Sequence, residues 1–186
     1  MNNPRLLQTA KGMVKSMKHE SEFKPVDKLP ELQFLLSETK FEFHREGDED
    51  EEYQYLKKGD VCITVQNPYQ SAPMFIDLND EFTLTYGAYH DHYYPDLQGY
   101  EEMVSNMQGI LKNEICLAAL YYGSEKRWLG STGIAKSQLM RPVKEIFDFV
   151  WKQSEFRKNL KDYGGEAQFC FWNPVDDRII KIPKGS

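Results

Sequence analysis

The chain has 186 residues, of which 40% are hydrophobic and 13% aromatic, so it is large and apolar enough to form a core. Its 29 acidic residues outnumber 23 lysines and arginines, and the net charge of −6 opposes non-specific nucleic-acid binding, which needs a basic surface. No apolar run approaches the roughly 20 residues of a membrane span. We expect a cytoplasmic protein with one domain over residues 1–186 and neither nucleic-acid nor membrane partners.

The N-terminal segment carries two helical patterns. Apolar residues recur at helical spacing through the first 17 positions, after a start signal of Asn3 followed by Pro4. Pro25 and Pro30 bracket a break, and leucines at positions 29, 32, 35 and 36 then predict a second short helix. We expect an N-terminal helix pair, with residues 1–24 as a helical extension of the domain.

The pattern changes to β-strands at residue 41. Strands are predicted, from their β-forming residues, at 41–44 (FEFH), 53–56 (YQYL), 61–65 (VCITV) and 74–78 (MFIDL). The acidic run 47–52 (GDEDEE) predicts a charged turn. Residues 81–94 (EFTLTYGAYHDHYY) predict one long strand, which Pro95 ends.

Beyond Pro95 a helix and two hairpins are predicted. Apolar residues between 100 and 111 mark one helix face, with Asp96 as its cap. Further elements are predicted as a hairpin of 115–122 with 126–131, a helix from Pro142 to Tyr163, and a last hairpin of 167–172 with 178–183. The whole order predicts an α+β fold: a mainly antiparallel sheet of about six to eight strands with helices packed on one face.

Residues 85–96 (TYGAYHDHYYPD) contain the most chemically suggestive pair, His90 and His92. On one long strand both would continue its apolar face, about 6.6 Å apart, while Asp91 would point the other way. Two imidazoles can share a metal ion, but a site needs a third ligand. The candidates are Asp96, Glu101, Glu102 and His44. A metal site, a ligand or partner surface, and a structural aromatic cluster all stay open, and the pattern favours the last.

The acidic run beside two tyrosines is the second candidate site. Such a run is normally a solvated loop, but it also suits electrostatic docking of a basic partner. Tyrosine is an aromatic residue favoured at interface centres. The predicted partner-binding residues are Asp48, Glu49, Asp50, Glu51, Glu52, Tyr53, Tyr55, Tyr89, Tyr93 and Tyr94.

Other motifs indicate no further chemistry. Cys62, Cys116 and Cys170 lie in apolar runs without a CxxC spacing, so we expect buried free thiols. The segment 130–137 (GSTGIAKS) approaches a phosphate-binding loop but has Ala135 in place of its second glycine, and is predicted to be a polar connection. No catalytic serine or cysteine motif is present, and we expect no cofactor.

In size, acidity and aromatic-rich strands without catalytic machinery, the chain resembles the small α+β immunity proteins that protect bacteria against polymorphic toxins. The segment 82–94 (FTLTYGAYHDHYY) is similar to strands ending in paired histidines in bacterial families. The resemblance implies a non-enzymatic binding protein that occludes a basic toxin with acidic and aromatic surface. Alternatives are a small metal-dependent hydrolase centred on His90 and His92, and an oligomeric ligand-binding module.

Overall fold

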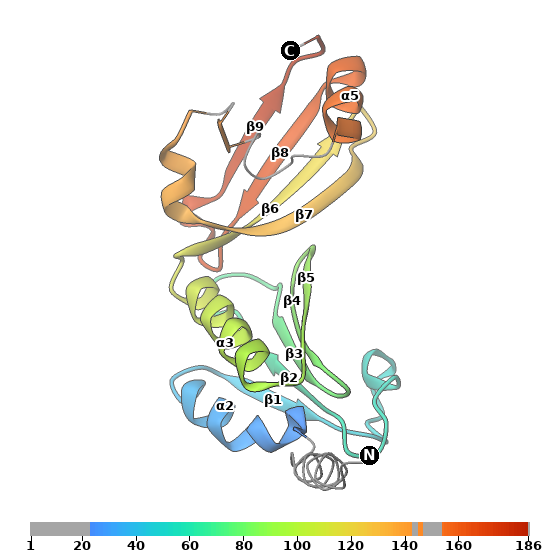
Figure 1. Cartoon of the computed structure of the whole chain (residues 1–186), viewed down its shortest axis with the longest axis vertical. Coiled ribbons are helices and arrows are strands. Elements are labelled where there is room, and N and C mark those ends of the chain that lie inside the picture. The colour runs from blue at the N-terminus through green and yellow to red at the C-terminus, as the bar shows by residue number, and fades with distance from the viewer. Residues whose placement is uncertain (1–22, 143–144, 147–153, 186) are drawn as a thin grey trace, which may run out of the picture.

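A computed structural model describes residues 23–142, 145–146 and 154–185, which form two lobes stacked along the long axis of the molecule (Figure 1). The strands in this part of the chain are β1 (Phe41–His44), β2 (Val61–Val65), β3 (Met74–Leu78), β4 (Phe82–Tyr86), β5 (Tyr89–Tyr93), β6 (Ile115–Tyr122), β7 (Arg127–Ala135), β8 (Gly165–Cys170) and β9 (Arg178–Ile182). The α-helices are α2 (Leu29–Leu35), α3 (Leu97–Leu111) and α5 (Ser154–Tyr163). The short 3-10 helices are η1 (Pro25–Lys28), η2 (Glu51–Tyr53), η3 (Lys136–Met140) and η4 (Pro174–Asp176).

The N-terminal lobe is a five-stranded antiparallel meander, ordered β1-β2-β3-β4-β5, with α2 and α3 packed on one face (Figure 1). Alternate residues of the central strands, such as Ile63, Ile76 and Leu84, are fully buried. They share a core with Leu32 of α2 and Met103 of α3. The apolar residues that alternate along the strands and those that recur along the helices therefore pack in one core layer.

Helix α3 is fixed at both ends by local contacts. The side chain of Asp96 accepts a hydrogen bond from the backbone nitrogen of Gly99 at 2.7 Å, which confirms the predicted cap. After the helix, Asn113 adopts a positive φ of 60°, as residues that end helices often do. Gly109 faces the first residue of β6, since a Cβ there would lie 2.5 Å from Cδ1 of Ile115. The helix thus lies close to the start of the second sheet.

The C-terminal lobe is a four-stranded antiparallel sheet, ordered β7-β6-β8-β9. The predicted hairpin of 115–122 with the following strand is confirmed as β6 and β7, and the last two strands pair as expected. A smaller core lies on one face, and it includes Leu120, Phe169 and Phe171. Two residues of this lobe, Leu117 and Trp172, belong to the core of the N-terminal lobe instead.

The lobes are joined by polar contacts as well. The hydroxyl of Tyr86 donates to the backbone carbonyl of Phe171 at 2.7 Å. The side chain of Asn113 makes two hydrogen bonds with the backbone of Asn173, at 2.8 and 3.1 Å. Ser131 of β7 donates to the carbonyl of Ala88 in the turn between β4 and β5. The ends of the two sheets are thereby held against each other.

The predicted α+β class with antiparallel strands is confirmed, but a single sheet of six to eight strands is not what the structure shows. The chain makes two sheets because β6 pairs with β7 and β8 and not with β5. Residues 53–56 are not a strand, since Tyr53 ends η2 and the next residues form a turn. The first predicted helix lies outside the described residues. Among those residues, no helix is long and apolar enough to cross a membrane.

The cysteines are free, as expected, but Cys170 is only half-buried. Cys62 and Cys116 are buried, and burial raises the pKa of each thiol to about 12, which makes them poor nucleophiles. The segment 130–137 is neither a phosphate loop nor a polar connection. Most of it belongs to β7, so its backbone amides take part in strand pairing and do not surround an anion.

Candidate functional site

The stretch 81–94, predicted as one strand, folds as the β4–β5 hairpin. A two-residue turn at 87–88 joins the strands, and Gly87 has a positive φ of 57°, as the first central residue of a type II′ turn requires. Tyr86 pairs with Tyr89, three positions later, so the alternation of faces is inverted across the turn. The two histidines therefore face away from the core, and the prediction that they continue the apolar face is wrong.

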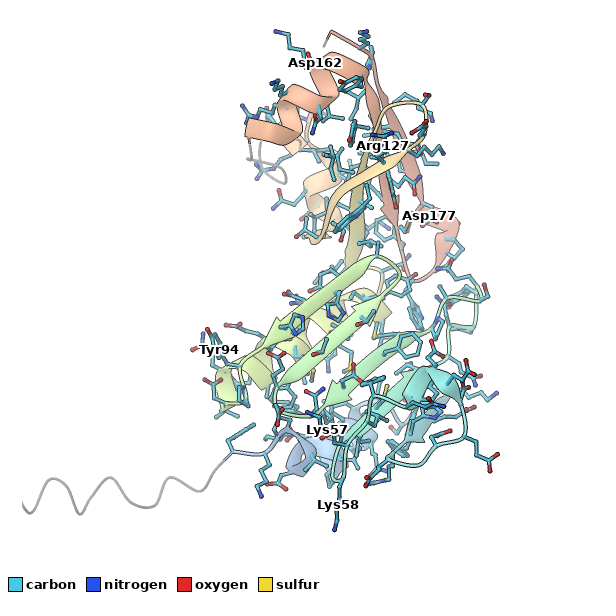
Figure 2. The ribbon with its side chains drawn as sticks, turned by 90° about the vertical axis from the view of Figure 1, so that its right-hand side faces the viewer. Lys57, Lys58, Tyr94, Arg127, Asp162 and Asp177 are labelled. Carbon is cyan, nitrogen blue, oxygen red and sulfur yellow. The ribbon has the colours of Figure 1, made fainter. Side chains whose placement is uncertain are left out.

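We call the side of the five-stranded sheet opposite α2 and α3 the outer face. Its residues, from β1 to β5, are Glu42, His44, Cys62, Thr64, Phe75, Asp77, Thr83, Thr85, His90 and His92. The loop of residues 45–60, which we call the acidic loop, packs on the outer face through Tyr53 and Leu56, against Cys62 and Phe75. Figure 2 labels Lys57 and Lys58 near the end of this loop. Both sites predicted from sequence therefore lie on one face of one sheet.

The start of the acidic loop is held by His44 of β1. Its ring stacks on that of Tyr53, with centroids 3.5 Å apart, and its Nδ1 lies 2.9 Å from a carboxylate oxygen of Asp48. This hydrogen bond lowers the pKa of Asp48. Tyr53 in turn contacts the hydroxyl of Thr64 at 2.9 Å. Stacking and hydrogen bonds thus tie the loop to β1 and β2.

The middle of the acidic loop is held by Tyr55. Its hydroxyl donates a hydrogen bond to the carboxylate of Asp77 at 2.5 Å, and Asp77 is only 9% exposed. Burial raises the pKa of Tyr55, so the phenol stays protonated and remains a donor. The ring itself stays half-exposed, at 51%. Tyr55 therefore satisfies a buried carboxylate while it presents aromatic surface to solvent.

The acidic side chains of the loop remain open to solvent. Glu49, Asp50, Glu51 and Glu52 are exposed, while Asp48 is half-buried against β1. Residues 45–60 contain seven carboxylates and three basic side chains, a net charge of −4 in a chain of −6. The predicted charged turn is confirmed, and the loop that contains it carries a local excess of negative charge.

The five predicted tyrosines separate into two groups. Tyr53, Tyr89 and Tyr93 are 5–6% exposed, and their hydroxyls bond inside the protein, so they belong to the packed interior. Tyr55 and Tyr94 are exposed. Tyr94 lies at the side of the lobe, away from Lys57 and Lys58 (Figure 2). Only Tyr55 combines an exposed ring with a place beside the acidic side chains.

The two histidines lie side by side on the exposed surface of β5. Their ring centroids are 4.6 Å apart and the rings are nearly perpendicular, at 83°. Nδ1 of His90 lies 2.8 Å from the hydroxyl of Thr85, and Nδ1 of His92 lies 2.8 Å from the carboxylate of Glu81. Glu81 was not among the predicted site residues. The hairpin register, had it been recognised, would have placed it on the face of both histidines.

None of the predicted third ligands joins the pair. Asp91 accepts a hydrogen bond from Tyr89 on the other side of β5, which confirms its predicted direction. Asp96, Glu101 and Glu102 cap or belong to α3, which covers the opposite face of the sheet, and His44 lies on the far edge strand. Within the described part of the chain, no group of three or more His, Cys, Asp or Glu side chains is arranged to hold a metal ion.

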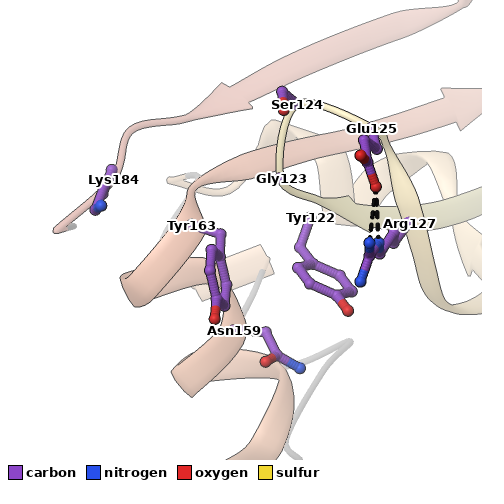
Figure 3. A pocket seen from close by; sticks show the side chains of 8 residues that line it. All are labelled: Tyr122, Gly123, Ser124, Glu125, Arg127, Asn159, Tyr163 and Lys184. Atoms are coloured by element: carbon purple, nitrogen blue, oxygen red, sulfur yellow. Dashed lines mark hydrogen bonds and ion pairs between the residues drawn. The ribbon is translucent and has the colours of Figure 1, made fainter.

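The largest cavity that we describe lies in the C-terminal lobe, away from these residues. It has a volume of about 490 Å³ and is lined by residues of the β6–β7 turn, of α5 and of the C-terminal end (Figure 3). Tyr122 and Tyr163 line it, but the charged groups of Arg127 and Glu125 are paired with each other at 2.8 Å. A second cavity of about 290 Å³ lies beside Tyr69 and Trp172. Neither cavity contains a residue predicted from sequence to function.

The outer face of the N-terminal sheet is thus the candidate site, with an ordered acidic loop on β1–β3 and a histidine pair on β5. Comparison of the chain with protein-family models, with curated proteins and with solved structures found no significant match. Any function must therefore be argued from the geometry of this face.

Proposed function

We propose that the chain is a non-enzymatic, immunity-type binding protein, which inhibits a basic bacterial toxin by covering its active surface with the acidic loop. The observation that carries the proposal is the way this loop is held. A run of exposed carboxylates is fixed on the outer face by His44, Tyr53 and Tyr55, whereas an ordinary charged loop has no such buried attachments.

A fixed acidic loop suits recognition for two physical reasons. Binding a basic surface orders the side chains of an interface, and a loop whose backbone is already anchored loses less conformational entropy. Concentrated negative charge also accelerates the encounter with a basic partner, an effect that salt weakens. The partner that fits this surface is a protein with a cluster of lysines or arginines around its active cleft.

Tyr55 is the proposed anchor at the centre of this surface. Aromatic residues that become buried at an interface contribute disproportionately to affinity. The hydroxyl of Tyr55 is already satisfied by Asp77, so its ring can be covered without leaving a polar group unpaired. Glu49, Glu51 and Glu52 precede it in sequence and supply the charge.

The test is capture of the partner from the native host, followed by affinity measurement with purified components. A variant with Glu49→Gln, Glu51→Gln and Glu52→Gln removes three exposed charges. It leaves Asp48, which bonds to His44 of β1, and Asp50, which accepts from the backbone nitrogen of residue 52. We expect it to bind at least tenfold more weakly at low salt, with a smaller dependence on salt. Tyr55→Ala should weaken binding further.

The matched control removes three exposed charges elsewhere. Glu101→Gln, Glu102→Gln and Glu114→Gln make the same change in net charge around α3, on the other side of the sheet. This control should keep wild-type affinity if the acidic loop is the docking surface. An acidic partner, or equal losses in the two triple variants, would refute the proposal.

A metal-dependent hydrolase centred on the histidine pair is the second candidate. The contact that favours it is the one between Glu81 and His92, because a carboxylate that orients an imidazole is a common feature of general bases. Both rings, however, lie exposed on a sheet, where none of the described residues forms a wall that would exclude water from a bound substrate. Turnover that disappears in His92→Ala, with the fold intact, would establish this alternative over the first.

A further inference from the structure

We infer that His90 and His92 form a two-imidazole binding site for a divalent transition-metal ion, with Zn²⁺, Ni²⁺ and Cu²⁺ as the class of ligand. The site lies on the outer surface of β5. The inference goes beyond the proposed docking function and does not depend on it, since the acidic loop lies over other strands.

The spacing of the two rings is the first support. Residues two apart on a strand project from the same side, and the two imidazole centroids are 4.6 Å apart. Both side chains are exposed, so an ion with its water shell reaches them without any opening of the core.

The contact with Glu81 is the second support. A carboxylate only accepts hydrogen bonds, so Nδ1 of His92 carries the proton in this contact when the ring is neutral. The lone pair then lies on Nε2, the nitrogen that remains to ligate a metal. Histidine ligands in metal sites commonly donate their other ring nitrogen to a carboxylate in this way.

The contact with Thr85 allows the same arrangement at His90. A hydroxyl can accept as well as donate a hydrogen bond, so Nδ1 of His90 can donate to Oγ1 of Thr85 at 2.8 Å. This leaves Nε2 of His90 as the second ligand. Each ring therefore has its own orienting partner, Glu81 on one side and Thr85 on the other.

The chemistry of the donors selects the class of ion. Imidazole nitrogen suits Zn²⁺, Cu²⁺ and Ni²⁺, whereas Mg²⁺ and Ca²⁺ prefer sets of oxygen ligands. Among the described residues no third side chain joins the two rings, so water fills the other coordination positions and the site binds more weakly than one with three protein ligands. The nearby carboxylate of Glu81 adds a favourable negative charge for any cation.

The test is titration of the full chain, without a polyhistidine tag, with ZnCl₂ and NiCl₂ followed by calorimetry. We expect one saturable site, weakened at least tenfold in His90→Ala and in His92→Ala. Glu81→Gln, which keeps both ligands but removes their carboxylate partner, should weaken binding about tenfold. NMR of the ring nitrogens should show that the metal perturbs Nε2 of both histidines.

Two controls separate this site from other metal-binding groups. His19→Ala changes a histidine outside the described residues, and Asp91→Asn changes the carboxylate between the pair that faces the other way. Both should keep wild-type affinity. Wild-type affinity in either His90→Ala or His92→Ala, or no saturable binding at millimolar metal, would overturn the inference. The triple variant of the acidic loop should bind metal with wild-type affinity. Failure of the docking proposal can therefore be distinguished from failure of the metal-site inference.

Discussion

The two sheets each bury a carboxylate on the face away from their main core, and they satisfy it in opposite ways. Glu166 of β8 is 3% exposed and forms ion pairs with Lys126 and Lys181. Asp77 of β3 is 9% exposed and accepts a hydrogen bond from the neutral hydroxyl of Tyr55. Among the described residues, no basic side chain pairs with Asp77.

The contrast means that one sheet neutralises its buried charge and the other does not. The C-terminal sheet balances the charge of Glu166 with its own Lys126 and Lys181. The outer face of the N-terminal sheet retains the carboxylate of Asp77 beneath the exposed carboxylates of the acidic loop. An excess of one sign of charge on one face attracts partners of the other sign.

The largest loss of stability is expected when the core of either lobe is disrupted, and this tests whether the two sheets unfold together. Phe82 and Phe169 are fully buried, one in each lobe, and replacement of either by alanine should lower the free energy of unfolding by about 3–5 kcal/mol. Because Leu117 and Trp172 insert into the core of the other lobe, we expect one unfolding transition in each variant by denaturant titration. A Phe169→Ala protein that melts in two steps would show instead that the lobes unfold separately. Val175→Ala, at an exposed position, is the control.

An intermediate effect is expected at the carboxylate that lacks a basic partner. Tyr55→Phe removes the hydroxyl and leaves the buried Asp77 without this donor, at a cost of about 1–3 kcal/mol of stability. In an Asp77→Asn background the same substitution should cost less, because the group left unpaired is then neutral. A double-mutant cycle with urea denaturation measures this difference. Equal costs in the two backgrounds would mean that the negative charge of Asp77 does not contribute.

The smallest effect is expected at Glu166, because the lysines that pair with it are exposed, and this effect should be present at neutral pH and disappear in acid. Hydrogen bonds from Lys126 and Lys181 lower the pKa of Glu166 from 4.5 to about 2 in the folded protein. A lowered folded-state pKa stabilises the protein above the unfolded value, and this stability is lost as the pH falls from about 4.5 to about 2. Glu166→Gln should therefore flatten the fall of the free energy of unfolding across this range. An unchanged slope would contradict the proposed role of the ion pairs.

Local patterns in the sequence predicted the first three strands of the first sheet correctly. The bounds of β1, β2 and β3 and the cap of α3 agree with the predictions, because alternation and capping are set by neighbouring residues. The division into two sheets was not predictable in this way. It depends on β6 pairing with β8, more than forty residues later, and no local period encodes such a partner.

The histidine pair shows why the site was predicted only in part. The turn at 87–88 has no asparagine or aspartate, and alternate positions from Phe82 to Ala88 are apolar, so the pattern predicts a continuous strand. Because the pattern does not reveal this turn, it predicts the wrong face for both histidines and does not predict the contact of Glu81 with His92. The acidic run was recognisable, but its attachment through Tyr53 and Tyr55 depends on tertiary contacts.

Strand β6 has a consequence for how this protein can be dissected. Its side chains alternate between two interiors, with Leu117 in the larger core and Leu120 in the smaller one. A truncation between α3 and β6 would remove Leu117 and, further along the chain, Trp172 from the first lobe. The fragment left behind would expose an apolar gap where those side chains had been, so neither half should be prepared as a free-standing piece.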